Sequence, residues 1–403
     1  MFIKHGQVVD STNKQPKPIN NTRNTFLKMK QRMIYKGIIT LLLFSLAYNG
    51  YADNRKDYTK TIKKEFSITK DGEVKIDNKF GKVVVNTWEK NSVKIAVTVI
   101  VRADSEKEAQ PLFERIAINF SNGRDFVKAK TEIEAKKSGW WGWGGWDNNN
   151  DYAINYDVYL PATIELDLNN EHGETIIAQL SGDATIDIAH GNITAEGFLG
   201  ELDLETAHSN GTIKAAKILK ADLSHSNIRF KNIGESDLET AHCNIDIDNI
   251  TTLRLDSRHT NFELGEIGDL RADSRHDDFE IEFINTIYSE AQHTQYDIEK
   301  VGKSIDFDFS HGGANIDHLA TGFEEVTLHG SHADYRIRVA DNATYTLDVE
   351  GSHAGIQYPR EMDITYEKDS NNSKEVKGRL GSSNGKGFGL IKAYLSHGGL
   401  RVR

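Results

Sequence analysis

Apolar and polar positions alternate along most of this chain in short segments that return at a fixed step. In residues 253–257 and 270–274 every second residue is apolar or small, and the residues between them are charged. Alternation with period two places the apolar side chains on one face of a strand. A second apolar series follows each first one with its parity shifted, as at Ile245, Ile247 and Ile250. Each repeat therefore predicts two strand segments joined at a corner.

One histidine marks each repeat. The steps between successive marks are 18, 18, 17, 17, 17, 17, 17 and 18 residues, and the marks are His172, His190, His208, His225, His242, His259, His276, His293 and His311. A short period repeated many times is the signature of a solenoid. We interpret the later His332, His353 and His397 as C-terminal rungs with longer corners. The pattern predicts an all-β parallel β-solenoid (β-helix) with rungs of 17–18 residues.

The change of parity after each histidine predicts the position of the corner. The next residue is small in most rungs and the one after it is often Asn, and both types tolerate a turn. The histidine shares the parity of the inward residues, so we expect it at the inner edge of its strand. Phe80 fits the same slot in the related segment 74–88. Rungs stack about 4.8 Å apart, so the rings should form a ladder.

The ladder permits two interpretations. Imidazoles on neighbouring rungs could share Zn²⁺, Cu²⁺ or Ni²⁺ ions. In this interpretation the metal ligands are His208, His225, His242, His259, His276 and His293. Alternatively the rings form a packing column, which the apolar Phe80 in the same slot favours. In either case stacked and buried imidazoles should have pKa values below about 6.5. Their contribution to stability should then be full above that pH and fall as the pH drops through it.

The first part of the chain differs from the repeats. Residues 62–101, 116–135 and 152–160 alternate like strands, and 104–115 predicts the single helix, with Asp104 or Ser105 as N-cap. Residues 366–388 are rich in Lys, Asn, Ser and Gly and predict a loop. We expect a leader over 1–52, a β-rich segment with one short helix over 53–160, and the solenoid over 161–403.

Residues 30–52 have the pattern of a secretory signal. Basic residues precede the apolar run 37–47, and Gly50 and Ala52 supply small residues before a cut at Asp53. Because the apolar run is shorter than the roughly 20 residues that span a membrane, no transmembrane segment is expected in the mature chain. We expect translation to start at Met29 or Met33. The predicted location is the periplasm or the cell surface, in association with the outer membrane.

Composition excludes several functions. The net charge of −11 argues against a nucleic-acid partner, and the single Cys243 excludes a disulfide framework. Cys243 occupies the small slot after its histidine, which indicates a structural role. Ser224 and Ser226 flank His225, but neighbours on a strand point to opposite faces, so no catalytic arrangement is indicated. We expect no cofactor and no catalytic residues.

Three surface features remain. A Trp cluster (Trp140, Trp141, Trp143 and Trp146) predicts either a contact surface for a ligand or partner, or a loop that covers the open end of the solenoid. Charged residues at the outward positions of two neighbouring repeats form a lattice that could bind acidic sugars or form ion pairs between its own members. They are Arg254, Asp256, Arg258, Arg271, Asp273 and Arg275. Acidic residues could hold Ca²⁺ or form a solvated face; they are Asp246, Asp248, Glu280, Glu282, Asp297 and Glu299.

Segments of the chain resemble a known family. VKIDNKFGKVVVNTWEKNSVKIAVTVIV, INYDVYLPATIELDLNNEHGETII and rungs such as LSHSNIRFKNI are similar to the bacterial exported β-strand-repeat family named "putative adhesin", over about residues 60–403. The resemblance implies a right-handed β-solenoid and no catalytic residues. This chain departs from it by placing His where related rungs carry Ser, Thr or an aromatic residue.

Together these observations predict a non-enzymatic, exported cell-envelope β-solenoid that binds a glycan or an envelope protein. A metal-binding protein that uses the histidine ladder is the first alternative. A polysaccharide-active enzyme is the second, by analogy of fold alone. The oligomeric state stays open.

Overall fold

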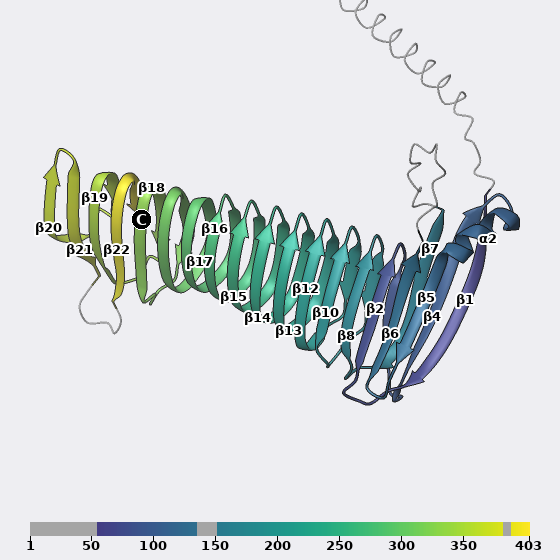
Figure 1. Cartoon of the computed structure of the whole chain (residues 1–403). Coiled ribbons are helices and arrows are strands. Elements are labelled where there is room, and N and C mark those ends of the chain that lie inside the picture. The colour runs from purple at the N-terminus through teal and green to yellow at the C-terminus, as the bar shows by residue number, and fades with distance from the viewer. Residues whose placement is uncertain (1–54, 135–150, 382–387) are drawn as a thin grey trace, which may run out of the picture. The chain divides into compact units, whose positions relative to one another are not determined.

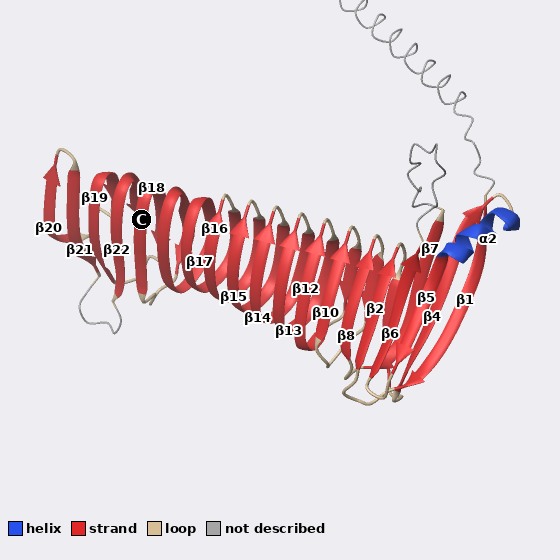
Figure 2. Cartoon of the chain, in the orientation of Figure 1, coloured by secondary structure: helices blue, strands red, loops and turns tan. Residues whose placement is uncertain are grey.

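A computed structural model describes residues 55–134, 151–381 and 388–403. Within these residues the chain consists of strands, turns and one helix, and all the strands join one hydrogen-bonded sheet (Figure 2). The predicted all-β class with a single helix is therefore confirmed. No helix in this part of the chain has the length and apolar character needed to cross a membrane.

The N-terminal segment combines antiparallel and parallel strands with the helix. Its elements are β1 (Lys56–Ser67), β2 (Glu73–Lys79), β3 (Val83–Trp88), β4 (Ser92–Ala103), α2 (Glu106–Arg115), β5 (Ile116–Asn122), β6 (Phe126–Ile133) and β7 (Tyr152–Pro161). Strand β4 pairs antiparallel with β1 and β7, and β5 pairs antiparallel with β6. The helix begins after Ser105, one of the two predicted N-caps.

The repeats follow as parallel strands in consecutive order. They are β8 (Glu165–Glu171), β9 (Glu174–Ile177), β10 (Ala184–Ala189), β11 (Asn192–Ala195), β12 (Phe198–Ala207), β13 (Asn210–Ser224), β14 (Asn227–Ala241), β15 (Asn244–Arg258), β16 (Asn261–Arg275), β17 (Asp278–Leu319) and β18 (Glu325–Val339). Figure 1 shows their rungs side by side in one row. From β13 to β14 each residue pairs with the one 17 positions later, from Asn210 with Asn227 to Ser224 with Ala241.

The alternating apolar positions form the interior, as predicted. Ile245, Ile247, Ile250, Leu253 and Leu270 are all buried. Because every rung repeats the pattern in register, like side chains stack on like side chains. Phe262, Phe279 and Tyr296, for example, stack inside the fold with ring centroids 4.6 and 4.3 Å apart.

The segment containing Phe80 forms a rung although it lies far from the repeats in the sequence. Strand β2 pairs in parallel with β8, and β3 pairs in parallel with β9. The backbone of Phe80 has a φ of 60°, and its ring stacks on that of His172 at 5.0 Å. The predicted equivalence of Phe80 with the histidine slot is confirmed.

At the C-terminal end the order of strands in space differs from the order in the sequence. The remaining elements are β19 (Tyr345–Gln357), β20 (Asp363–Ser370), β21 (Ser373–Leu380) and β22 (Gly389–Val402). The last strand, β22, lies between β18 and β19 and pairs in parallel with both. The prediction of a loop over 366–388 is wrong for residues 366–380, because β20 and β21 form an antiparallel hairpin that pairs with β19.

Candidate functional site

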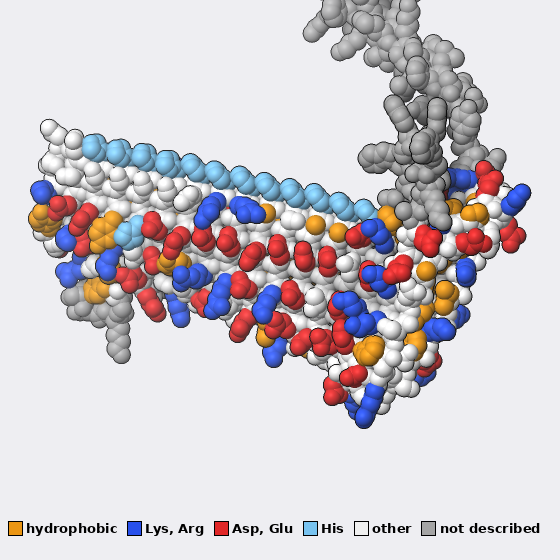
Figure 3. Space-filling model, viewed as in Figure 1, with side chains coloured by type: hydrophobic (Ala, Val, Ile, Leu, Met, Phe, Trp, Pro, Cys, Tyr) orange, Lys and Arg blue, Asp and Glu red, His pale blue; other side chains and the backbone are white. Residues whose placement is uncertain are grey.

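A column of exposed imidazoles follows one edge of the rungs (Figure 3). It contains twelve of the described histidines, in the spatial order His172, His190, His208, His225, His242, His259, His276, His293, His311, His332, His397 and His353. Neighbouring ring centroids are 4.8–5.1 Å apart, and the rings are nearly parallel except at His293 and His311, where the planes differ by 25°. We call these residues the histidine column.

The predicted inner position of these histidines is wrong. All twelve are exposed, and each has a φ between 49° and 60°, in the left-handed region of the backbone. A left-handed residue bends the chain sharply, so the histidine is the corner residue. Its own side chain turns outward, and the next residue turns inward. His is among the few types beyond Gly that enter this region with some frequency.

The inward residue after each histidine forms a second column, which sequence reasoning described only as small. In the six rungs from Ser209 to Thr294 its side chain accepts a hydrogen bond from the backbone N–H of the equivalent residue one rung earlier. Examples are Gly191 N to Ser209 Oγ at 3.2 Å, Ser209 N to Ser226 Oγ at 3.2 Å and Thr260 N to Asp277 Oδ1 at 2.8 Å. This column explains why a small residue with an acceptor atom suits the slot, since an unpaired buried N–H is costly.

Cys243 belongs to this inner column. It is buried, and its Sγ accepts from the backbone N–H of Ser226 at 3.5 Å. Burial raises the pKa of its thiol, which disfavours the nucleophilic thiolate. Ser226 is likewise buried, whereas His225 lies outside, so the Ser224–His225–Ser226 sequence assembles no catalytic group.

Two histidines of the column have lowered pKa values. Desolvation lowers the pKa of His172, and the neighbouring His190 lowers it further. Desolvation and then the adjacent His259 and His225 lower the pKa of His242. Between these folded values and the unfolded value of about 6.5 the unfolded chain binds more protons. Their contribution to stability is full above about pH 6.5 and falls as the pH drops through that window, which is the predicted direction.

The distance between neighbouring rings determines whether two histidines of the column can bind the same metal ion. The six histidines proposed as ligands, His208 to His293, are consecutive members with ring centroids 4.8–4.9 Å apart. Zn–N bonds measure about 2.0–2.1 Å, so two nitrogens on one ion lie at most about 4.2 Å apart. Parallel rings related by one rung keep their equivalent nitrogens about as far apart as their centroids. One ion therefore cannot bridge two neighbours unless the rings rotate out of the stack.

We accordingly expect Zn²⁺ and Cu²⁺ to leave the melting temperature of the purified chain nearly unchanged. A ligand that binds only the folded state adds about 4 kcal/mol at a thousandfold excess over its Kd, so tight binding would produce a large rise. The measurement is metal content together with a titration of the melting temperature, with H208N/H225N/H242N as the matched variant. Several ions per chain and a large rise that this variant lacks would contradict the expectation.

Outward side chains of the strand segment before each histidine form what we call the leading face. Three residues before the histidine stands a carboxylate in rung after rung: Asp187, Glu205, Asp222, Glu239, Asp256, Asp273 and Glu290. We call this row the acidic column, and Figure 3 shows it parallel to the histidine column. Coulomb repulsion, first from Asp187, raises the pKa of Glu205. Like charges in register are unfavourable in an isolated chain.

The predicted charge lattice lies on the same face. Its members Arg254, Asp256, Arg258, Arg271, Asp273 and Arg275 are exposed. Arg271 lies over the ring of Tyr288 at 4.5 Å, and Arg275 is 3.8 Å from Asp273. Two of its arginines, Arg271 and Arg275, thus have partners within the chain, although exposed pairs of this kind contribute little to stability.

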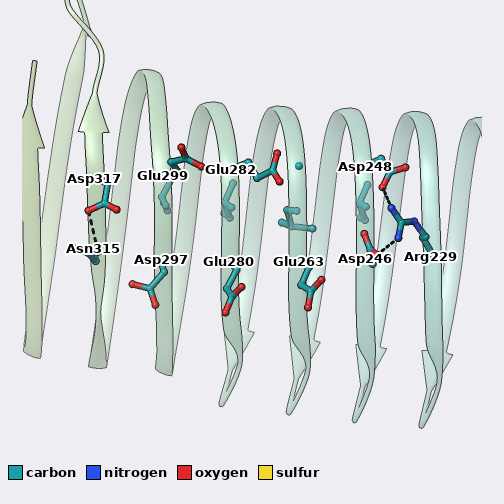
Figure 4. A pocket seen from close by; sticks show the side chains of 15 residues that line it. Arg229, Asp246, Asp248, Glu263, Glu280, Glu282, Asp297, Glu299, Asn315 and Asp317 are labelled. Atoms are coloured by element: carbon teal, nitrogen blue, oxygen red, sulfur yellow. Dashed lines mark hydrogen bonds and ion pairs between the residues drawn. The ribbon is translucent and has the colours of Figure 1, made fainter.

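The opposite, trailing face holds an open groove of about 890 Å³ (Figure 4). Six of its lining residues are the predicted acidic set Asp246, Asp248, Glu280, Glu282, Asp297 and Glu299, and the structure adds Arg229, Glu263, Asn315 and Asp317. Figure 4 shows two rows of carboxylates across successive rungs. Arg229 contacts Asp246 at 3.0 Å and Asp248 at 2.6 Å.

A smaller hollow of about 360 Å³ adjoins the groove and shares Arg229, Asp246 and Glu263 with it. Its wall includes an amide ladder in which Asn244 donates to Asn227 at 2.7 Å and Asn261 donates to Asn244 at 2.9 Å. Within the described ranges no group of three or more His, Cys, Asp or Glu side chains is placed to hold a metal ion. The 17-residue step predicts that these side chains lie in rows from rung to rung. The groove that they line could be recognised only in the structure.

The predicted Trp contact surface lies outside the described residues. Trp140, Trp141, Trp143 and Trp146 all fall within 135–150. Their role therefore stays a prediction.

No protein-family model and no curated protein matches the chain. Among solved structures, a "putative cell adhesion protein" from Clostridium sporogenes is 11% identical, with 86% of this chain and 98% of that chain covered and a TM-score of 0.18. A "putative adhesin" from Parabacteroides merdae is 10% identical (88% and 97% covered, TM-score 0.30). A "putative lipid binding protein" from Parabacteroides distasonis is 12% identical (64% and 94% covered, TM-score 0.32). Similarity at this level carries no argument about the function of this chain.

Proposed function

We propose that this chain is a non-enzymatic, exported module of the cell envelope that binds an extended glycan along the groove of its trailing face. The observation that supports the proposal is the groove itself. It is open, it crosses successive rungs, and its walls repeat hydrogen-bonding carboxylates and amides at the spacing of the rungs. Stacked repeats create extended binding surfaces of this kind, which suit a polymer better than a compact small molecule.

The charge of the groove narrows the class of glycan. Eight carboxylates and one guanidinium line it, so a polymer that carries carboxylates or phosphates would be repelled. Carboxylates accept hydrogen bonds from hydroxyl and ammonium groups. The preferred ligand is therefore a neutral or amino-bearing glycan. An envelope protein with a basic surface is the competing partner, and the experiment below distinguishes the two.

The proposal includes the finer features of the fold and of export. The rungs close into a right-handed β-solenoid, since parallel crossovers are right-handed in about 98% of cases. Residues 1–52 are a leader that is removed on export to the periplasm or the cell surface, 53–160 form the N-terminal segment and 161–403 form the solenoid. Trp140, Trp141, Trp143 and Trp146 supply a second contact with the partner.

We expect the triple variant E263Q/E280Q/D297N to bind glucosamine oligosaccharides at least about tenfold more weakly than the unchanged chain, because each lost charged acceptor weakens one or more hydrogen bonds. The measurement is calorimetric titration at about pH 7.5. The matched control, E239Q/D256N/D273N, removes the same charge from the leading face and should retain full affinity.

Three other outcomes would count against this function. Equal weakening by both variants would show a nonspecific effect of charge. Absence of binding to both neutral and amino-bearing oligosaccharides would remove the glycan and leave the protein partner. Release of shorter oligosaccharides during the titration would show that the chain cleaves its ligand, which would favour a polysaccharide-active enzyme over a binding module.

A further inference from the structure

The leading face carries the acidic column, and the histidine column follows its edge on the same rungs (Figure 3). The acidic column stands three residues before the histidines along each strand. Directly before the histidine, four successive rungs carry only small side chains: Ala189, Ala207, Ser224 and Ala241. The side chains between the two columns are therefore short in the rungs of His190 to His242, which favours close approach of a second surface.

We propose that two copies of this chain pair through these columns when the histidines become protonated. The histidine column of one copy lies on the acidic column of the other, and the reverse contact forms by symmetry. The contact patch comprises His190, His208, His225 and His242 with Asp187, Glu205, Asp222 and Glu239. It is self-complementary, as a twofold interface requires.

The repeat distance identifies a second copy as the partner. The histidines of the patch are spaced 4.8–5.1 Å apart, and the carboxylates belong to the same paired rungs. Both columns therefore advance by the same step, so every histidine of one copy meets a carboxylate of the other. A surface with a different spacing would lose register after a few contacts.

Symmetry also specifies the orientation of the pair. A twofold axis parallel to the column, placed over the small residues, exchanges the two columns, so unlike charges meet rung by rung. An axis perpendicular to the column would place histidine on histidine. The two copies therefore run side by side in the same direction. Farther along, Arg258 and Arg275 take the place of the small residues and would face their own counterparts, which confines close contact to the rungs of the patch.

Protonation supplies the charge that the contact needs. Residues 53–403 contain 41 Lys and Arg and 59 Asp and Glu, so protonating the twelve histidines of the column moves their formal charge from −18 to −6 and reduces the repulsion between copies. The acidic column also gains a counter-charge for carboxylates that repel one another in the single chain. Desolvation and the adjacent His259 and His225 lower the pKa of His242 from its ordinary value of about 6.5, so pairing should develop only below that pH.

Other charged groups adjoin the column and influence its titration. Glu171 raises and Lys79 lowers the pKa of His172, and Arg258 lowers that of His242. Within the patch the residues two positions after each histidine are uncharged asparagines, and the charged Arg229 is engaged by Asp246 and Asp248. The remaining charged residues next to the column are Glu174, Arg275, Asp277, Asp278 and Asp334.

Sedimentation velocity on the purified chain without added ligand tests the proposal. We expect a single species at about pH 7.5 and a species of twice its mass at about pH 5.5, with the association weakened by high salt. The variant H190N/H208N/H225N/H242N should stay single at both pH values, since Asn tolerates the left-handed backbone at the corner. Circular dichroism is the control for the folding of this variant.

The variant D187N/E205Q/D222N/E239Q separates specific pairing from aggregation near the isoelectric point. It removes four negative charges from the patch and should weaken specific pairing at least about tenfold, whereas D246N/E263Q/E280Q/D297N, which removes the same charge from the trailing face, should pair like the unchanged chain. Mixing the histidine-column variant with the acidic-column variant should restore part of the pairing, because the intact column of each then faces the intact column of the other.

An unchanged mass of the original chain at about pH 5.5, or stronger association of the acidic-column variant, would overturn the proposal. It goes beyond the proposed function and is independent of it. Pairing uses the leading face and requires no glycan, whereas glycan binding is measured on the trailing face at about pH 7.5. Pairing and glycan binding can therefore be tested separately, and failure of one does not affect the other.

Discussion

A chain that ends at Gly381 should lose the ordered structure of β19, β20 and β21 while its central rungs stay folded. Strand β22 pairs with β18 on one side and with β19 on the other. It also buries Ile391, Leu395, Leu400 and Val402. At about 1.5–3 kcal/mol for each buried side chain of this size, the loss is on the order of 6–12 kcal/mol. Because each rung contacts only its neighbours, the damage should remain local.

Hydrogen exchange measures this effect directly. In the truncated chain we expect amides of 345–380 to exchange orders of magnitude faster than in the full chain, and amides of 227–275 to keep their protection. Addition of a peptide covering 388–403 should restore part of the lost protection. Unchanged protection of 345–380 after truncation would mean that β22 does not occupy the position between β18 and β19.

Substituting valine at three adjacent corners should destabilise the central rungs severely. His208, His225 and His242 have φ values of 51°, 49° and 58°. An ordinary side chain pays roughly 1–2 kcal/mol to adopt this conformation, and a β-branched one is a genuine outlier there. Each substitution also removes stacking worth about 0.5–1.5 kcal/mol. We expect H208V/H225V/H242V to lose on the order of 5 kcal/mol or more of unfolding free energy.

The triple asparagine variant H208N/H225N/H242N is the matched control. It loses the same stacking but keeps a residue suited to the left-handed conformation, so it should lose only about 1.5–4.5 kcal/mol. Denaturant unfolding of the two variants and the unchanged chain gives the comparison. If both variants lose the same free energy, the cost comes from the rings, and the backbone argument is wrong.

Several features of the fold could be read from the sequence because they depend on local periodicity. Alternation with period two identified Ile245, Ile247 and Leu253 as interior, and the constant step predicted that like residues would stack from rung to rung. The assignment of Phe80 to the histidine slot rested on the same local register. Each of these predictions depends only on whether a residue falls on the inward or the outward position of the alternation and on its distance from the next equivalent residue. Both can be read from the sequence alone.

The position of the histidine required the backbone conformation. Parity alone placed it inside, because counting assumes that the chain stays extended until the small residues after it. The left-handed conformation at the histidine itself shifts the parity one residue earlier, so the ring faces solvent and Ser209, Thr260 or Asp277 faces inward. Counting residues does not distinguish a corner after the histidine from a corner at the histidine itself. The repeated hydroxyl and carboxyl acceptors directly after the histidines were a signal that could have indicated a corner at the histidine.

The sequence by itself determined the repeat, its step, the interior residues and the rows of identical side chains that the step must produce. Only the tertiary structure decided which of those rows share a face, that β2 and β3 join the first rung, and that β22 enters between β18 and β19. The physical reason is that periodicity is a property of neighbouring residues along the chain. Insertion of a distant strand depends instead on unpaired backbone groups and apolar surface at the end of a stack, which exist only after the rungs have formed.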